Sequence, residues 1–158
     1  MSGPAMNKKL IFTLSAALLL SACDSPPAQP PLSEAPLAGA TIGGDFALTD
    51  QNGKKRTFKE FDGAYRIVYF GYTNCPDICT PDMQNLMAGL KAYEKSHPEL
   101  GAKIQPIFIT VDPLRDTPEV LKQFVSAFHP RAIGLTGTEA EIADAAKKFA
   151  IYTSRVEG

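Results

Sequence analysis

Two cysteines that directly follow a largely apolar stretch constrain this chain more than any other feature. Residues 66–70 have the composition of a central buried strand, and Cys75 and Cys79 come soon after them. An apolar stripe at three- and four-residue spacing then predicts a helix from about residue 76 or 81 to residue 96. Residues four apart share a helix face, with Cβ atoms roughly 5–6 Å apart. The two sulfurs can therefore close a disulfide or hold one soft metal ion.

A dithiol between a strand and a helix is the thioredoxin arrangement, although thioredoxins have two residues between the cysteines and this chain has three. Pro76 suits the first helical position. The dipole and the free N–H groups of a helix amino terminus stabilise a thiolate. We therefore expect Cys75 to be the more exposed and more acidic thiol, with Cys79 one turn further on. Asp77, between the cysteines, is a candidate for tuning the site.

The order of the predicted elements defines the fold class. Asn52-Gly53 predicts a β-hairpin between residues 46–49 and 55–58. After the hairpin, predicted strands (66–70, 104–111, 133–136) alternate with predicted helices (76 or 81–96, 117–128, 138–150). This alternation indicates an α/β domain with a mostly parallel sheet flanked by helices. A sheet that ends at residues 151–158 leaves an exposed edge, so we expect the domain to be incomplete at its carboxyl end.

The amino terminus is expected to be a targeting segment. Residues 7–9 are basic, and the apolar run at 10–20 is too short to span a bilayer. The run ends in Leu20-Ser-Ala-Cys23, which resembles the bacterial lipoprotein signal box. That resemblance implies a signal peptide at 1–22 and a lipidated Cys23, followed to residue 38 by a Pro-rich tether. The globular domain is expected at 39–158, anchored to the bacterial inner membrane and facing the periplasm.

This assignment leaves one cysteine pair for chemistry. Of three cysteines, one carries the lipid, and Cys75 and Cys79 face an oxidising compartment. A dithiol kept there needs a reductant or a metal. The net charge of −1 and the absence of tryptophan give no indication of a nucleic-acid partner.

Three ordered motifs carry a family resemblance. They are Tyr72-Thr-Asn-Cys-Pro-Asp-Ile-Cys-Thr-Pro81, Ile109-Thr-Val-Asp-Pro-Leu-Arg-Asp-Thr-Pro118 and Phe128-His-Pro-Arg-Ala-Ile-Gly-Leu-Thr-Gly137. Together they resemble the Sco (SenC) family of copper proteins, which assist assembly of cytochrome c oxidase. The resemblance covers about residues 40–158 and implies a thioredoxin-like fold. In that family two cysteines and a later histidine bind copper. Cys75 and Cys79 match the cysteines, and no residue here matches the histidine.

The two histidines and a nearby methionine have structural interpretations. His129 lies in a Phe-His-Pro motif typical of a helix end, and His97 precedes Pro98 at another helix end, where solvent exposure is expected. Met83 belongs to the apolar stripe and is expected in the core. Without a matching imidazole, the chain is expected to bind Cu(I) measurably and Cu(II) weakly.

The segment after the strand at 104–111 is expected to lie near the dithiol. Ligand sites gather at the carboxyl ends of strands in open α/β sheets. Asp112 therefore either tunes the site or orders its loop. We expect Arg115 and Asp116 to form a loop ion pair.

The leading functional hypothesis is a copper chaperone that is not a turnover enzyme. It would receive Cu(I) from a copper donor and deliver it to the dinuclear copper centre in the copper-receiving subunit of cytochrome c oxidase. The alternative is a thiol–disulfide oxidoreductase, supplied by a thiol reductant, in which Cys75 attacks and Cys79 resolves. A peroxiredoxin-type peroxidase, a structural zinc site and a disulfide-stapled structural module are less favoured.

Overall fold

The computed structural model describes residues 31–34 and 37–153, which belong to two units, Met1–Ala40 and Thr41–Gly158. The described part of the first unit contains a short 3-10 helix, η1 (Leu32–Glu34). The predicted signal peptide, the predicted lipid site Cys23 and most of the predicted tether lie outside the described residues. Within the described ranges, no helix has the length and apolar character needed to cross a membrane.

The second unit is built on a five-stranded sheet. Its strands are β1 (Ala47–Asp50), β2 (Lys55–Thr57), β3 (Tyr65–Gly71), β4 (Ile104–Thr110) and β5 (Ile133–Thr136). They lie in the order β2-β1-β5-β4-β3. β3, β4 and β5 are parallel, whereas β1 is antiparallel to both β2 and β5. The predicted mixed α/β class, with an amino-terminal hairpin on a largely parallel sheet, is confirmed.

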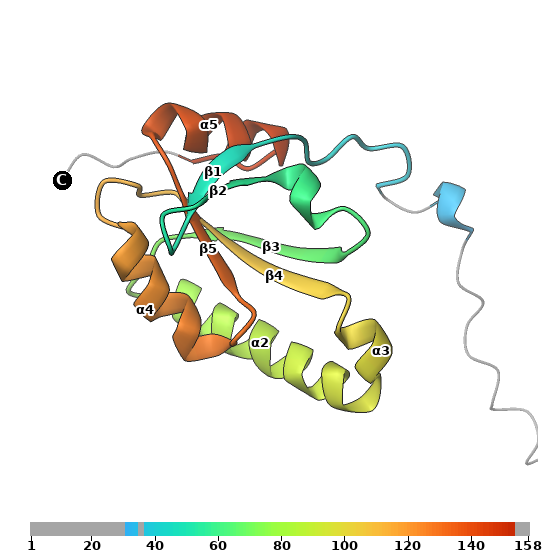
Figure 1. Ribbon diagram of the computed structural model, residues 1–158. Coiled ribbons are helices and arrows are strands. Elements are labelled where there is room, and N and C mark those ends of the chain that lie inside the picture. Colours follow the sequence, from blue (N-terminus) through green and yellow to red (C-terminus); the bar gives the residue numbers. More distant parts are fainter. Residues whose placement is uncertain (1–30, 35–36, 154–158) are drawn as a thin grey trace, which may run out of the picture. The chain divides into compact units, whose positions relative to one another are not determined.

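Helices cover both faces of this sheet. A 3-10 helix, η2 (Phe58–Phe61), follows β2; α2 (Cys79–Ser96) and the short α3 (Pro98–Gly101) connect β3 to β4. The connection from β4 to β5 is α4 (Pro118–Phe128), and α5 (Glu139–Lys148) follows β5. In Figure 1, α2 and α4 lie on one face and α5 on the other. The caps of α4 and α5 are as predicted: Thr117 accepts from Val120 N–H, and Thr138 with Glu141 forms a capping box.

The predicted start of the helix after the cysteines was too early. α2 begins at Cys79, so Pro76 does not occupy its first turn. Residues 72–78 form a loop of turns and bends. The residue that precedes α2, Ile78, offers no side-chain cap to the first helical N–H groups. Cys75 therefore lies in a loop, and only Cys79 belongs to the helix.

The core consists of two apolar clusters, divided by the sheet. Successive side chains of a strand point to opposite faces, and β4 contributes to both clusters: Ile107 and Ile109 to one and Phe108 to the other. The first cluster includes Ile142 and Ala145 of α5. The second contains side chains of α2 and α4, namely Met83, Met87, Leu90, Leu121, Val125 and Phe128. Met83 is only 2 % exposed, which confirms its predicted place in the core.

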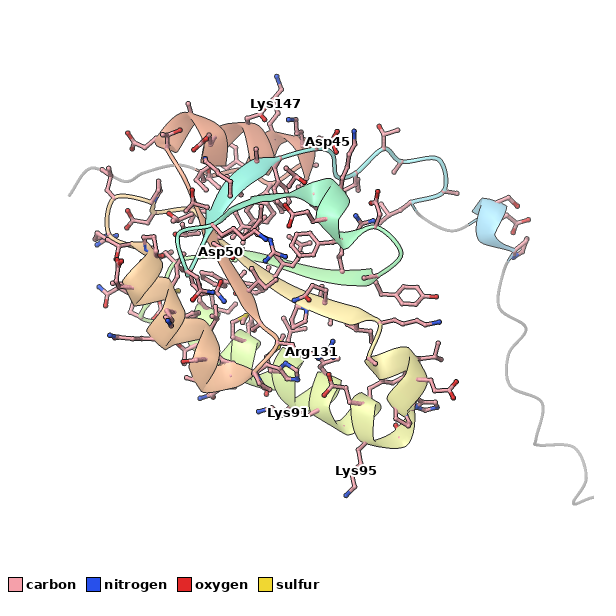
Figure 2. All side chains as sticks on the ribbon, in the orientation of Figure 1. Asp45, Asp50, Lys91, Lys95, Arg131 and Lys147 are labelled. Atoms are coloured by element: carbon pink, nitrogen blue, oxygen red, sulfur yellow. The ribbon has the colours of Figure 1, made fainter. Side chains whose placement is uncertain are left out.

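A buried carboxylate closes the β1–β2 hairpin. Asp50 is 3 % exposed and accepts hydrogen bonds from the N–H groups of Asn52 (2.9 Å) and Lys54 (3.0 Å). Gly53 has a positive φ of 78°, a conformation that glycine adopts without strain. Asp50 lies at this hairpin in Figure 2. Asp50 therefore satisfies backbone donors of the turn and also pairs with Arg56 of β2 over 3.4 Å.

Candidate metal centre

The two cysteines meet where β3 passes into α2. Gly71 ends β3, Cys75 lies half-buried in the following loop, and Cys79 is the first residue of α2 and 5 % exposed. The backbone N–H of Cys79 donates to the Sγ of Cys75 over 3.4 Å. Both residues are free thiols. The structure brings the two cysteines together, as their spacing predicts, although they do not share a helix face.

A glycine makes room for the inner thiol. A Cβ atom built on Gly71 would lie 3.1 Å from the Sγ of Cys79 and 2.9 Å from the ring of Tyr69. Contacts this short force a neighbour to move, so any side chain at this position displaces the sulfur or the ring. Gly71 therefore allows the amino terminus of α2 to pack with its sulfur against the end of β3.

The two thiols differ in acidity because their surroundings differ. The Cys79 thiol, as a hydrogen-bond donor, and the N–H groups of Cys79, Asp77 and Ile78 lower the pKa of Cys75 to about 7. Burial raises the pKa of Cys79, and its hydrogen bond to Cys75 adds to that rise. Near neutral pH the pair thus combines a thiolate with a buried thiol. This is the order of exposure and acidity expected from the sequence.

Both cysteines open into a cavity of about 820 Å³. The cavity is lined by Tyr72 and Asp77 from the loop, Asp112 and Arg115 from the segment after β4, and residues of α5 and of 151–153. In Figure 1 the connections that leave β3 and β4 toward α2 and α4 lie at the same edge of the sheet, because parallel strands end there. The predicted tuning residues Asp77 and Asp112 are thus on the same cavity as the dithiol.

The ion pair expected between Arg115 and Asp116 is wrong. The guanidinium of Arg115 pairs with the carboxylate of Asp112, whose side chain is 13 % exposed. Asp116 is instead 1 % exposed and accepts hydrogen bonds from two threonines. Thr73 donates its N–H (3.0 Å) and its hydroxyl (2.6 Å), and Thr110 donates its hydroxyl (2.6 Å). Sequence reasoning missed this role because Thr73 is 43 positions away and no local pattern links the two residues.

Two tyrosines border the dithiol. Tyr69 donates its hydroxyl to the Asp82 carboxylate over 3.0 Å, and burial is the largest cause of the raised pKa of this phenol. Negative charge on Cys75 is the largest cause of the raised pKa of Tyr72. Both phenols are therefore protonated at neutral pH and can donate hydrogen bonds.

The structure places neither histidine on the cavity. His129 caps the end of α4, with its Nε2 3.2 Å from a Glu94 carboxylate oxygen and its Nδ1 accepting from the Arg131 N–H. Arg131 also donates to carbonyl oxygens around α3 and the start of β4, where it lies in Figure 2. His97 is exposed and stacks on Tyr93. His129 thus caps a helix end and His97 is exposed, as predicted for each.

The cavity combines the two sulfur donors with carboxylates and phenols. Within the described residues, no group of three or more His, Cys, Asp or Glu side chains is placed to hold a metal ion. The two sulfurs are the soft donors there. Sulfur donors select thiophilic ions such as Cu(I) over hard cations.

The SCO1/SenC family model matches residues 34–158 of the chain. The chain belongs to the SCO1/SenC family. A SCO2-like protein of Rickettsia felis is 44 % identical over 133 residues, which cover 79 % of this chain and 63 % of that relative. The chain therefore spans under two thirds of the relative's length.

Solved structures of Sco proteins share the fold. ScoI of Bradyrhizobium japonicum, solved with copper bound, is 42 % identical to this Sco chain with a TM-score of 0.67, over 74 % of this chain and 72 % of that one. BsSco, a member of the Sco family of cytochrome c oxidase assembly proteins in which a disulfide switch was identified, is 28 % identical with a TM-score of 0.59, over 72 % and 68 % of the two chains. The thioredoxin-like fold expected from the sequence is thus confirmed.

Proposed function

We propose that this Sco chain is a copper chaperone. It receives Cu(I) from a copper donor, holds it on Cys75 and Cys79, and passes it to the copper-receiving subunit of cytochrome c oxidase. The observation that carries the proposal is the hydrogen bond from Cys79 N–H to the Cys75 sulfur, which joins two free thiols beside an open cavity. The copper in a 42 % identical ScoI supports it.

The difference between the two thiols suits a carrier. Cys75, with a pKa of about 7, offers a thiolate at neutral pH without prior deprotonation. Cys79 is buried and keeps its sulfur out of reach of bulky competitors. The more exposed sulfur of Cys75 is where a thiolate of the acceptor can join the coordination of Cu(I) and replace one protein sulfur. The transfer exchanges one copper–sulfur bond for another and changes no covalent bond of the acceptor, so in this proposal the chain acts as a carrier and not as a turnover enzyme.

The proposal includes a cellular setting, supported by the resemblance of residues 20–23 to the bacterial lipoprotein signal box. Cys23 carries the lipid after removal of residues 1–22, and the protein stays on the inner membrane and faces the periplasm. A tether of Pro-rich composition then gives the domain reach to a membrane-bound acceptor.

A Cu(I) titration tests the proposal. The full chain with Cys23→Ser leaves Cys75 and Cys79 as its remaining thiols, since the sequence has three cysteines. Under anaerobic reducing conditions, in competition with a Cu(I) chelator, this chain should bind one equivalent. Cys75→Ser should abolish that binding while circular dichroism stays unchanged. A folded parent that leaves all copper with a weak chelator would refute copper carriage.

A second function is favoured by the same pair of thiols. The Cys75 thiolate can attack a disulfide of an acceptor, forming a mixed disulfide and releasing one acceptor thiolate. Cys79 then loses its proton and attacks the Cys75 sulfur, which releases the second acceptor thiolate and leaves a Cys75–Cys79 disulfide. The acceptor is reduced and the pair oxidised, so a thiol reductant must restore the dithiol. The disulfide switch in BsSco supports this alternative.

Cys79→Ser separates the two functions. If reduction is the function, this variant should accumulate a mixed disulfide with a peptide that carries two cysteines joined as a disulfide, because nothing resolves it. If copper carriage is the function, the variant should lose Cu(I) affinity without trapping that peptide beyond the level of a free thiol. Cys75→Ser is the matched control, since it removes the attacking sulfur.

A further inference from the structure

The loop that carries Cys75 is attached to the rest of the domain at a buried carboxylate. Two aspartates are buried in the described part of the chain, Asp116 and Asp50. Asp116 takes part in none of the salt bridges found among the described residues. Hydrogen bonds from Thr73 and Thr110 satisfy it instead, at 2.6–3.0 Å. A buried carboxylate needs such donors, and these bonds are strong because the acceptor is charged.

One of these donors, Thr73, lies in the same loop as Cys75. Thr73 precedes Cys75 by two residues in a loop that belongs to no helix or strand. Inside that loop, the Cys75 N–H donates to Tyr72 O over a longer distance of 3.3 Å. The two bonds from Thr73 to Asp116 therefore connect the Cys75 loop to a segment 43 positions later.

The same carboxylate is also connected to the segment after β4 that lines the cavity. The Thr110 hydroxyl donates to Asp116 over 2.6 Å and accepts from the Asp112 N–H over 2.9 Å. Thr110 is the last residue of β4, and Asp112 lines the cavity. Hydrogen bonds thus link the loop with Cys75 and the loop with Asp112 to Asp116 and to Thr110 at the end of β4.

We propose that Asp116 is a positioning residue that holds Cys75 next to Cys79 in the dithiol state, and so sets the Cu(I) affinity of the pair. This inference rests on the proposed function. A loop that is already in place loses little freedom when the two sulfurs close on an ion, whereas a loose loop must be ordered at that step. Groups that orient metal ligands act in this way, and their loss typically weakens binding by about 10- to 100-fold.

Four variants of the full Cys23→Ser chain isolate this role. Asp116→Asn weakens the acceptor, and Thr73→Val removes the hydroxyl with little change in shape. Thr73→Ser keeps the hydroxyl and the N–H and should restore parental behaviour. The control is Asp50→Asn, because Asp50 is also buried and accepts two backbone N–H bonds, with an ion pair to Arg56 in addition, but does not line the cavity.

Two measurable quantities depend on the position of Cys75. The first is the Cu(I) dissociation constant against a competing chelator, expected to rise about 10-fold in Asp116→Asn and Thr73→Val. The second is the redox equilibrium of the pair with glutathione. A disulfide holds Cys75 by itself, whereas the dithiol depends on Thr73 and Asp116, so loss of the anchor should favour the disulfide by about fivefold. Asp50→Asn should lower stability to urea without changing either quantity.

The results decide between positioning and general stability. Shifts in both quantities for Thr73→Val, reversed in Thr73→Ser and absent in Asp50→Asn, would support the proposal even if Asp116→Asn fails to fold. Unchanged values in Thr73→Val, or equal changes in Asp50→Asn, would overturn it. If the parent binds no Cu(I), the proposed copper function fails, and the glutathione equilibrium alone decides whether Asp116 positions Cys75.

Discussion

The N–H of Cys79 points at the sulfur of Cys75 across 3.4 Å, so the first residue of α2 stabilises a negative charge on the loop residue four positions earlier. The Cys79 side chain contributes in the same direction as a thiol donor. The acidity of Cys75 therefore depends on its partner cysteine as well as on the end of the helix. This relationship gives the pair its asymmetry.

Alkylation rates should reveal that asymmetry. In the Cys23→Ser chain, iodoacetamide should modify Cys75 first, with a rate that rises through a midpoint near the Cys75 pKa of about 7. Cys79 should react only at higher pH, because burial raises its pKa. Mass spectrometry of the labelled peptides at several pH values measures both midpoints.

Cys79→Ala provides the control for this prediction. It removes the thiol donor but keeps the backbone N–H, so the Cys75 midpoint should move up toward that of an ordinary thiol. A midpoint that stays near 7 would mean that the backbone N–H groups alone account for the acidity.

Gly71→Ala should disturb both the fold and the site. The new methyl group would meet the Tyr69 ring at 2.9 Å, the Cys79 sulfur at 3.1 Å and the Phe108 ring at 3.3 Å. Overpacking of this kind costs about 1–3 kcal/mol. Urea unfolding should show that loss, and the Cu(I) dissociation constant should rise because Cys79 is displaced.

Gly89→Ala in α2 is the matched substitution. No atom lies within 4 Å of a Cβ built at Gly89, so the change should raise stability by about 0.5–1 kcal/mol through helix propensity. Equal losses in the two variants would show that the contacts at Gly71 are not the cause.

Met83→Leu tests whether the methionine one turn beyond Cys79 contributes to the metal site. Met83 is 2 % exposed and packs in the cluster with Phe108, away from solvent. A leucine of similar volume should cost less than about 1.5 kcal/mol and leave the Cu(I) dissociation constant unchanged. A tenfold weaker affinity in a folded Met83→Leu chain would show that the thioether ligates copper.

Glu141 should make a small, pH-dependent contribution to stability. Its pKa is lowered to about 2, first by the Lys55 ammonium and then by the Thr138 N–H. A carboxylate with a depressed folded-state pKa stabilises fully above its unfolded pKa of about 4.3 and loses that effect as the pH falls toward 2. The pair is well exposed, so screening limits the effect to about 0.5 kcal/mol.

Urea unfolding of Glu141→Gln across pH checks this sign. The variant should be less stable than the parent at pH 7, and the difference should shrink between about pH 4 and pH 2. A difference that is independent of pH would mean that packing, and not charge, explains the effect of the substitution.

The sequence was a good guide to elements whose signals are local. The largely apolar run at 104–111 located β4, and the capping residues Thr117 and Thr138 marked the starts of α4 and α5 within a residue. The start of α2 carried no such signal: Ile78 provides no cap, and Pro76 suggested an earlier first turn. Where a helix end lacks a side-chain cap, packing decides its position.

In the candidate site, too, residues with local sequence signals were predicted and residues with distant partners were not. Cys75 and Cys79 are recognisable from their spacing, because a dithiol needs only two cysteines a few positions apart. Asp116 is not, since its partner Thr73 is 43 positions away and is brought to it by the parallel pairing of β3 with β4. Arg115 pairs with Asp112, three positions earlier, and not with the adjacent Asp116, so adjacency in the sequence predicted the wrong partner.

Copper X-ray absorption of the Cu(I)-loaded Cys23→Ser chain tests whether Cys75 and Cys79 bind one ion together, because it counts the sulfur atoms bound to that ion. We expect two sulfur neighbours per copper in the parent chain, whereas Cys75→Ser and Cys79→Ser should hold no copper on a sulfur pair. Copper bound by nitrogen and oxygen alone, or a signal that is the same in all three chains, would contradict the assignment of Cys75 and Cys79 as the joint Cu(I) site.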